Sequence, residues 1–419
     1  MTSKNNIIAG LDIGTSNIVV VIAELPNDPN IKGPINIIGV GTGPSRGLRK
    51  GVVINIELTV AAIGKAIAQA ETMAGITVRS VYISLSGSHI KSFNSNGVVA
   101  VRNKEVSYHD VEKVIEAAKA VSIAADQEIL HVLPQEFIID QQDGIKDPLG
   151  ISGVRLEAKV HIVTGSISSA RNVVKCANKC GLNVSDIIFS ALASARSVLA
   201  PEEQELGVCL IDIGGGTSDI VVFQGGAVKH SAVIPVGGNH ITNDIAAGLR
   251  TPIAAAEEIK AKHGSAMVSL LSKDETIEVP STGGRPATVT PRLLLAEIIE
   301  PRVAELFNLI QAELQKAKCE DYLTGGFVLT GGTAGLKGIT KVAEKVFNLP
   351  VRVGSPYGVG GLRDLVNDPE YAAAVGLVQH GFLTHKTSSH MGALGNSIIE
   401  KIKIFDYIKK VGNWISTRL

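Results

Sequence analysis

Residues 11–22 read LDIGTSNIVVVI and residues 211–223 read IDIGGGTSDIVVF, and this repeated pattern predicts the fold. In both copies, apolar and β-branched runs lie on either side of a glycine-containing turn, which predicts a β-hairpin. Asp12 and Asp212 occupy the same place just before the turn, and the turn of the second copy is two residues longer. One such hairpin would be ordinary turn chemistry, but two copies about two hundred residues apart indicate an internal duplication.

The two predicted hairpins have the composition of a phosphate clamp. Glycine lets backbone N–H groups approach phosphate oxygens without a Cβ in the way, and hydroxyl side chains add donors. Two hairpins that face each other across a cleft could hold a polyphosphate from both sides. Asp12 and Asp212, at the strand ends, would then face a Mg²⁺ ion that keeps most of its waters. The predicted phosphate-binding residues are Gly14, Thr15, Ser16, Asn17, Gly214, Gly215, Gly216 and Thr217.

Three further segments fall where such a clamp would need them. Residues 237–239 follow a strand-like run and open a helical run, which could place a helix N-terminus near phosphate or ribose. The acid and base at 257 and 260 could reach a ribose hydroxyl and a base edge, although this spacing is more often a solvated ion pair. Residues 331–333 form a turn at which an adenosine can lie close to the backbone. The candidate contacts are Gly237, Gly238, Asn239, Glu257, Lys260, Gly331, Gly332 and Thr333.

Composition excludes several classes of function. The 419 residues include 40 Lys and Arg against 40 Asp and Glu, so a protein that coats nucleic acid is excluded. Aromatic residues make up only 4%, which argues against a base-stacking surface, and 45% hydrophobic residues exclude wholesale disorder. The four cysteines show neither a disulfide framework nor zinc spacing, which indicates a reducing cytoplasm. We find no signal-peptide pattern and no apolar run of the ~18–20 residues that a membrane-spanning helix needs.

Strands and helices alternate in two halves, which predicts an α/β protein of two lobes with a cleft between them. The long helix predicted from about residue 291 to 319 contains Pro301, which should kink it. The predicted divisions are a first lobe of residues 1–86 with 165–205 and 361–383, an insertion at 87–164, a second lobe of 206–232 with 300–360, its own insertion at 233–299, a flexible linker at 384–396, and a terminal helix at 397–419.

On these residues the chain resembles the actin/Hsp70/sugar-kinase ATPase superfamily, whose members carry both phosphate hairpins and the adenosine turn in this order. Within the superfamily it is most similar to the FtsA family of bacterial cell-division proteins. The similar stretches are VGTGPSRGLRKGVV (40–53), VLPQEFIID (132–140), GISGVRLEAKVHIVT (150–164), IEVPSTGGRP (277–286) and FVLTGGTAGLKG (327–338). The resemblance implies an actin-like (ribonuclease H-like, duplicated) fold with ATP and Mg²⁺ as cofactors.

The resemblance also implies a function. By resemblance, the protein would be a polymerising scaffold that anchors the FtsZ ring to the cytoplasmic face of the bacterial inner membrane at the division septum. The C-terminal peptide of the tubulin-like protein FtsZ would dock on residues 233–300, and later division proteins would be recruited through 87–164. Self-association into actin-like filaments and contact with membrane lipids complete the implied partners, with no nucleic acid among them.

The position that would orient the attacking water for ATP hydrolysis carries a residue poorly suited to that role. Members of the superfamily that hydrolyse ATP well usually carry Glu or Gln at the strand–helix junction of the first lobe, where it orients the attacking water. Ser190 takes that place here by its spacing to the alanine-rich helix. A serine is a poor proton acceptor, so a contribution of typically ~100–10,000-fold is missing. We therefore expect ATP binding with at most slow hydrolysis.

The last 24 residues read NSIIEKIKIFDYIKKVGNWISTRL (396–419) and predict an amphipathic helix that lies in a membrane interface. Five positive and two negative residues give this segment a net charge of +3, and it holds the only Trp. The polar, small residues before it have linker composition. A terminal helix docked on the body is the alternative. The predicted membrane contacts are Lys403, Ile404, Phe405, Ile408, Lys410, Val411, Trp414, Ile415, Arg418 and Leu419.

Two other functions fit the same fold. A small-molecule kinase would need a catalytic acid on the substrate side of the cleft and has no use for a membrane tail. An Hsp70-like chaperone would need a long β domain after the ATPase core, and too few residues follow Phe382. The segment GPSRG (43–47) matches the nucleophile elbow of α/β-hydrolases, but the residues after it predict a turn and a strand instead of a helix.

Overall fold

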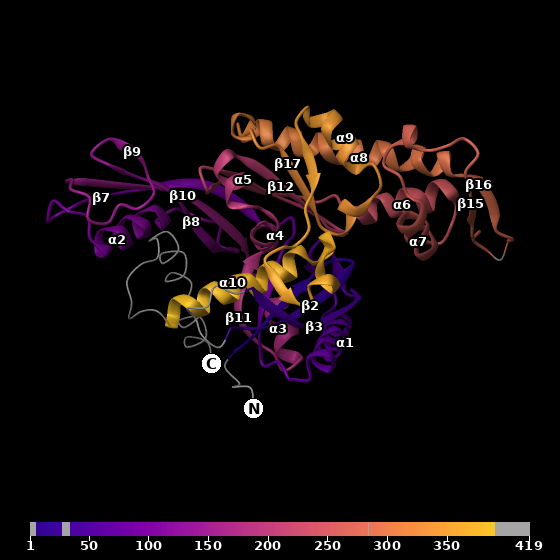
Figure 1. The fold of residues 1–419 in the computed structure, drawn as a ribbon, viewed down its shortest axis with the longest axis horizontal. Coiled ribbons are helices and arrows are strands. Elements are labelled where there is room, and N and C mark those ends of the chain that lie inside the picture. Colours follow the sequence, from indigo (N-terminus) through magenta and orange to yellow (C-terminus); the bar gives the residue numbers. More distant parts are fainter. Residues whose placement is uncertain (1–5, 27–33, 284, 390–419) are drawn as a thin grey trace.

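Two sheets with the same internal order form the two lobes of the molecule (Figure 1). The computed structural model describes residues 6–26, 34–283 and 285–389. In each lobe an antiparallel hairpin is followed by a third antiparallel strand, and a later strand runs parallel to the first strand of the hairpin. The predicted duplication is therefore present in the strand pairing itself.

The first-lobe sheet has six strands and the second-lobe sheet has five. In spatial order the first contains β11 (Asn183–Phe189), β6 (Ser80–Leu85), β1 (Ile7–Ile13), β2 (Asn17–Glu24), β3 (Ile35–Pro44) and β19 (Val359–Gly361). The second contains β14 (Ala227–Ile234), β13 (Ser218–Gln224), β12 (Val208–Ile213), β17 (Phe327–Thr330) and β18 (Val351–Val353).

Helices cover both sheets and leave the hairpin turns at their edges. Helix α1 (Ile56–Ala74) begins where the Asn55 side chain accepts a hydrogen bond from the Leu58 N–H and ends at Gly75, whose φ is +67°. Its buried stripe, which includes Ile63 and Ala66, packs on β2 and β3. The other helices of the two lobes are α3 (Ile167–Lys179), α4 (Ser190–Val198), α5 (Pro201–Leu206), α9 (Ile339–Phe347) and α10 (Ala372–Ser389).

Residues 87–164 form a separate layer at one end of the molecule, the left end in Figure 1. Helix α2 packs on a four-stranded sheet, and the core between them contains Val114, Phe137 and Leu156. Helix α2 begins after a capping box at Ser107 and ends at Lys119. The elements are β7 (Lys91–Ala100), α2 (Tyr108–Lys119), β8 (Gln127–Ile139), β9 (Gln142–Ile145) and β10 (Arg155–Ser166), with strand order β7-β10-β8-β9.

This inserted subdomain docks on β14 of the second lobe through buried polar contacts. Ser92 Oγ donates to the Ser231 carbonyl at 2.5 Å, and Gln135 Nε2 donates to the Val228 carbonyl at 2.7 Å. His161 is fully buried, and its ring nitrogens lie 2.7 Å from Asn94 Oδ1 and 2.9 Å from Ser231 Oγ. Burial, reinforced by the charges of neighbouring histidines, lowers the pKa of His161 to about 3. The interface is therefore built around a neutral histidine.

The second-lobe insertion lies at the opposite end in Figure 1. Helix α8 is one helix through Pro301, and the predicted boundary between residues 299 and 300 falls inside it. Its buried face, with Val303, Phe307 and Ile310, packs in the second-lobe core. The elements are α6 (Gly238–Leu249), α7 (Ile253–His263), β15 (Thr276–Val279), β16 (Thr288–Pro291) and α8 (Arg292–Lys316).

The C-terminal part of the described chain returns to the first lobe. Strand β19 pairs in parallel with β3, so the return begins by Val359, slightly before the predicted 361. Helix α10 continues to Ser389, so residues 384–389 are helical where a linker is predicted. The predicted membrane helix at 397–419 lies outside the described residues. Of the helices that the structure describes, none has the length and apolar character needed to cross a membrane.

Candidate functional site

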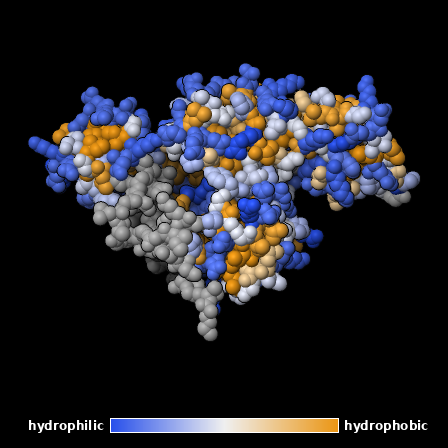
Figure 2. Space-filling view, in the orientation of Figure 1, coloured by the Kyte–Doolittle hydropathy of each residue, from blue (hydrophilic) through white to orange (hydrophobic). Residues whose placement is uncertain are grey.

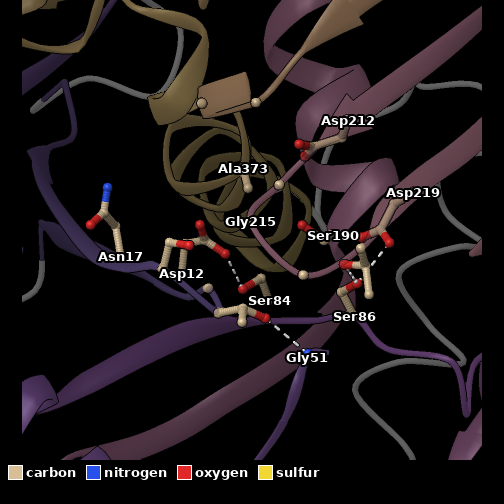
Figure 3. A pocket seen from close by; sticks show the side chains of 18 of the residues that line it. Asp12, Asn17, Gly51, Ser84, Ser86, Ser190, Asp212, Gly215, Asp219 and Ala373 are labelled. Carbon is tan, nitrogen blue, oxygen red and sulfur yellow. Dashed lines mark hydrogen bonds between the residues drawn. The ribbon is translucent and has the colours of Figure 1, made fainter. Parts of the chain in front are cut away.

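The turns of the two hairpins meet in one pocket between the lobes (Figure 3). All ten residues predicted at these turns line it. They are Asp12, Gly14, Thr15, Ser16, Asn17, Asp212, Gly214, Gly215, Gly216 and Thr217. Ser190, the first residue of α4, lines the same pocket. The clamp geometry predicted from the repeat is therefore present.

The hairpin turns approach each other so closely that side chains are excluded between them. A Cβ added to Gly215 would lie 1.9 Å from Ser16 Oγ, and one added to Gly216 would lie 2.7 Å from Thr15 Oγ1. Ser16 Oγ also reaches across the cleft to Asn239 at the start of α6, with which it forms a hydrogen bond. A side chain at Gly215 or Gly216 would therefore force Ser16 or Thr15 to move.

Three aspartates line the pocket, and each accepts a hydrogen bond from a serine. Ser84 Oγ donates to Asp12 at 2.5 Å and Ser194 Oγ donates to Asp212 at 2.5 Å. Enclosure in the pocket raises the pKa of Asp12 to about 7, against the opposing effect of the Ser84 hydrogen bond. Enclosure also raises the pKa of Asp212, and the Ser194 hydrogen bond opposes that shift. Both shifts mean that ionising these carboxyls costs more in the pocket than in water, and a nearby cation would reduce that cost.

The third carboxylate, Asp219, joins the two lobes directly. Ser86 of the first lobe donates to Asp219 Oδ1 at 2.7 Å, and its hydroxyl lies 3.1 Å from that of Thr217. Burial, and then the charge of Asp212, raise the pKa of Asp219 well above its ordinary value. The hydrogen bonds from Ser86 and Thr217 oppose this rise in pKa.

The oxygen-rich donor set suits a hard cation. Carboxylates and hydroxyls are the ligand types that Mg²⁺ prefers, and Mg²⁺ is usually held by one or two carboxylates with waters and substrate phosphates. Within the described parts of the chain, no group of three or more His, Cys, Asp or Glu residues is arranged to hold a metal ion by itself. Asp12 and Asp212 fit such a role only together with a ligand that supplies oxygens.

The predicted contacts of α6 and α7 form a layer behind the pocket and do not line it. The N–H groups of Gly238 and Asn239 donate to the carbonyls of Gly214 and Gly215, at 2.9 and 2.8 Å. These donors, predicted near phosphate or ribose, support the second hairpin turn instead. Gly237, also predicted as a contact, packs against the same turn.

Lys260 and Glu257 form the ion pair that their spacing predicts, with 2.7 Å between Nζ and Oε2. Lys260 Nζ also donates to Thr242 Oγ1 at 2.9 Å and to the Gly238 carbonyl at 3.2 Å. The pair therefore fastens α7 to the beginning of α6. Neither residue is among those that line the pocket.

The turn at residues 331–333, which the sequence predicts to lie near an adenosine, contributes Gly331 and Gly332 to another wall of the pocket. The two glycines line the pocket together with Pro369 and Glu370 of the short 3-10 helix before α10 (Pro369–Tyr371) and with Ala373 at the start of α10. Gly331 has φ +83°, and a Cβ on it would lie 2.3 Å from Asp212 Oδ1, so only glycine fits. Thr333 does not line the pocket; its hydroxyl donates to the Gly214 carbonyl at 3.1 Å.

Five polar side chains that line or support the pocket were not predicted from the sequence. Asp219 could have been found, because it aligns with Asn17 in the repeat. Ser84 and Ser86 follow from the rule that ligands gather at the carboxyl ends of parallel strands, since β6 lies beside β1 and runs parallel to it. Ser194 and Glu370 carry no such signal, because only the packing of α4 and of the 3-10 helix before α10 brings them to the pocket.

Family models cover most of this architecture. A model described as "Cell division protein FtsA" matches residues 209–376, and one described as "SHS2 domain inserted in FTSA" matches residues 87–164. Among curated proteins, the chain is 48% identical over 412 residues to Cell division protein FtsA of Pseudomonas aeruginosa, covering 98% of each chain. It is 44% identical over 423 residues to that of Escherichia coli, covering 99% of this chain and 98% of the other.

Solved structures of actin-like proteins share the fold at low identity. A PilM-PilN type IV pilus biogenesis complex matches with a TM-score of 0.65 and 18% identity over 90% of this chain and 98% of the other. MreB5 of Spiroplasma citri bound to ADP matches with a TM-score of 0.54 and 14% identity over 93% and 100%. A MamK double helical filament matches with a TM-score of 0.51 and 11% identity over 90% and 99%.

Proposed function

Because this chain belongs to the FtsA family of cell-division proteins, we propose that it is an actin-like division scaffold that binds ATP with Mg²⁺ between its lobes. In this role it self-associates into filaments and links the FtsZ ring to the inner face of the cytoplasmic membrane at the septum. The proposal that the protein binds ATP is supported chiefly by the meeting of the two glycine turns in one pocket.

Each wall of the pocket has a task in this proposal. The backbone of the turns at residues 14–17 and 214–217 receives the phosphates, and Gly331 with Gly332 receives the adenosine. Asp12 and Asp212 hold Mg²⁺ through its waters. The ion offsets the charge of the phosphates, which is the chemistry it supplies when bound. A structural neighbour bound to ADP, MreB5, supports nucleotide as the ligand class.

Turnover of the bound ATP is proposed to be slow or negligible. Ser190 occupies the junction between β11 and α4, where it can bind a water but accepts a proton poorly. A small-molecule kinase, the alternative use of this fold, is not favoured by the family membership. ATP consumption that depends on an added sugar or acid would instead support a small-molecule kinase.

The second-lobe insertion offers a surface for the FtsZ peptide. Ile253 and Val289 have 63% and 74% of their surface exposed, and Leu270 and Leu294 are exposed in the same insertion. Figure 2 shows hydrophobic residues at this end of the molecule among hydrophilic ones. We propose that a short apolar peptide docks there, and that later division proteins contact residues 87–164.

The membrane part of the proposal depends on the sequence of 397–419, which lies outside the described residues. The test is co-sedimentation of the protein with liposomes that contain anionic lipids. We expect the full chain to sediment, a chain truncated after residue 395 to stay in solution, and Trp414→Glu to weaken binding strongly. Normal sedimentation of the truncated chain would rule out the anchor.

The nucleotide part has its own test. Equilibrium binding of a fluorescent ATP analogue is measured with Mg²⁺ and with excess chelator, on the wild type and on Asp12→Asn with Asp212→Asn. We expect binding that weakens when Mg²⁺ is removed, and a loss of that Mg²⁺ dependence in the double variant. A wild-type chain that binds no adenine nucleotide would contradict the proposal.

A further inference from the structure

The pocket between the lobes has an unbalanced charge. Four carboxylic side chains line it, those of Asp12, Asp212, Asp219 and Glu370, and no Lys or Arg is among the described residues that do so. A nucleotide polyphosphate would add several negative charges, of which one Mg²⁺ offsets only two. Phosphate sites in proteins ordinarily include a basic side chain for this reason. A cation from the rim of the pocket is therefore needed.

A short hairpin at the rim carries such a cation. Strands β4 (Leu48–Arg49) and β5 (Val52–Val53) are joined by a turn of Lys50 and Gly51. The Gly51 N–H donates to Thr15 Oγ1 at 2.9 Å, and Gly51 lines the pocket (Figure 3). A Cβ built on Gly216 would lie 3.0 Å from the Cα of Lys50. The turn thus touches both phosphate hairpins at once.

Lys50 has a left-handed backbone conformation that other residue types adopt more easily. Its φ is +51° and that of Gly51 is +77°. Two successive positive φ values belong to the type I′ turn, whose first position is usually Asn, Asp or Gly. A lysine there costs stability relative to glycine, and such strain is often kept at functional sites. The side chain is exposed, and within the described part of the chain it forms no ion pair or hydrogen bond.

The other lysine near the pocket is already engaged. Lys260 Nζ is fixed by Glu257, Thr242 and the Gly238 carbonyl, and it stands behind the second hairpin turn. Its position leaves it outside the pocket lining. The backbone of Lys50 adjoins the pocket, and its side chain is exposed.

We propose that the β4–β5 hairpin is a third phosphate-binding element of this site and that the Lys50 ammonium group contacts the phosphates of the bound nucleotide. This inference rests on the proposed nucleotide binding and adds to it the residue that supplies the positive charge. The segment from 40 to 53, otherwise without a role in the site, then has one.

Replacing Lys50 with glycine distinguishes an effect on nucleotide affinity from an effect on the stability of the fold. Lys50→Gly removes the charge and at the same time relieves the left-handed backbone, so it should keep or raise the melting temperature. Binding of ATP with Mg²⁺, measured by calorimetry, should weaken about tenfold or more, as expected for the loss of a hydrogen bond to a charged group. Lys50→Arg should retain most of the affinity. The loss should be largest for ATP, smaller for ADP and nearly absent for AMP.

Lys104 provides a matched control. It is an exposed lysine with φ +57°, and it lies in the inserted subdomain, outside the pocket lining. Lys104→Gly should give a similar gain in melting temperature with unchanged ATP affinity. ATP affinity of Lys50→Gly within about twofold of the wild type would overturn the role of Lys50 and leave nucleotide binding intact. A wild type that binds no nucleotide would overturn both proposals.

Discussion

Ser16 Oγ donates a 3.0 Å hydrogen bond to Asn239 Oδ1, and this bond joins the first phosphate turn to the beginning of α6. The two residues lie 223 positions apart in the sequence and in different lobes. Asn239 is itself held by its N–H, which donates to the Gly215 carbonyl. The bond therefore reports directly on whether the cleft is closed.

A double-mutant cycle on Ser16 and Asn239 measures their coupling energy across the cleft and so tests whether the lobes are closed in solution. Ser16→Ala and Asn239→Ala should each lower the free energy of unfolding by about 0.5–1.5 kcal/mol, and the double variant by less than their sum. Chemical denaturation of the four proteins gives the coupling energy. Strictly additive losses would show that the lobes stand apart in solution.

The close approach at Gly215 predicts a suppressor. Gly215→Ala should destabilise the protein by about 1–3 kcal/mol, because its Cβ would overlap the side chain of Ser16. In a Ser16→Gly background the same alanine should cost little, because the obstructing atoms are gone. Thermal denaturation compares the two backgrounds.

Gly64 is the matched control for this substitution. It lies inside α1, and a Cβ there meets nothing within 4 Å. Gly64→Ala should therefore raise stability by about 0.5–1 kcal/mol. An equal cost of Gly215→Ala in both Ser16 backgrounds would mean that the turns do not meet.

The pKa of Asp12 predicts how stability depends on pH. The pKa rises from 3.8 in the unfolded chain to about 7 in the fold, so the folded state favours the protonated carboxyl. The cost of ionising it is absent below pH 3.8, grows as the pH rises, and is complete above about 7. Asp12→Asn should thus stabilise the nucleotide-free protein at pH 8 but not at pH 4.

The expected gain at pH 8 is on the order of 2 kcal/mol, less than the full shift would give, because the carboxyl keeps some contact with solvent. Urea denaturation at the two pH values measures it. Asp274→Asn, at an exposed position, is the control and should show no such gain. Equal effects of Asp12→Asn at both pH values would contradict the raised pKa.

His161 predicts a loss of stability in acid. Its pKa is 6.5 in the unfolded chain and about 3 in the fold, so the unfolded state binds the proton first. The stability is complete above pH 6.5 and declines as the pH falls toward 3. At pH 5 the loss should be about 2 kcal/mol, and His161→Gln should remove that part of the pH dependence.

His109 serves as its control, because 70% of its side chain is exposed on the same subdomain. His109→Gln should leave the pH profile of unfolding unchanged. Protease sensitivity of the segment around 91–100 can be followed in parallel, since protonation of His161 should loosen the contact with β14. A wild-type profile that is flat between pH 7 and 5 would refute the neutral histidine.

The sequence predicted what is local in the chain. The hairpin turns depend on glycines and β-branched runs within a dozen residues, so their form and their carboxylates could be predicted. The Glu257–Lys260 pair was predicted to be either a ligand contact or an ion pair, and the structure contains the ion pair.

What the sequence did not predict depends on how distant elements pack. Ser84 reaches Asp12 because β6 lies beside β1, and Ser194 reaches Asp212 because α4 packs against β12 and β13. The N–H groups of Gly238 and Asn239 resemble free helix-terminal donors in the sequence, but the fold pairs them with carbonyls of the neighbouring turn. Such pairings are a property of the assembled lobes.

Helix α10 connects two places that the proposed function keeps separate. It begins beside Ala373 in the pocket and runs 18 residues to Ser389, a length of about 27 Å (Figure 1). A helix of this length transmits displacement as a stiff rod: a tilt of about 5° at its start moves its far end by about 2 Å. Under the proposed function, a shift of Ala373 on nucleotide binding would be carried along α10 to Ser389, the last residue that the structure describes.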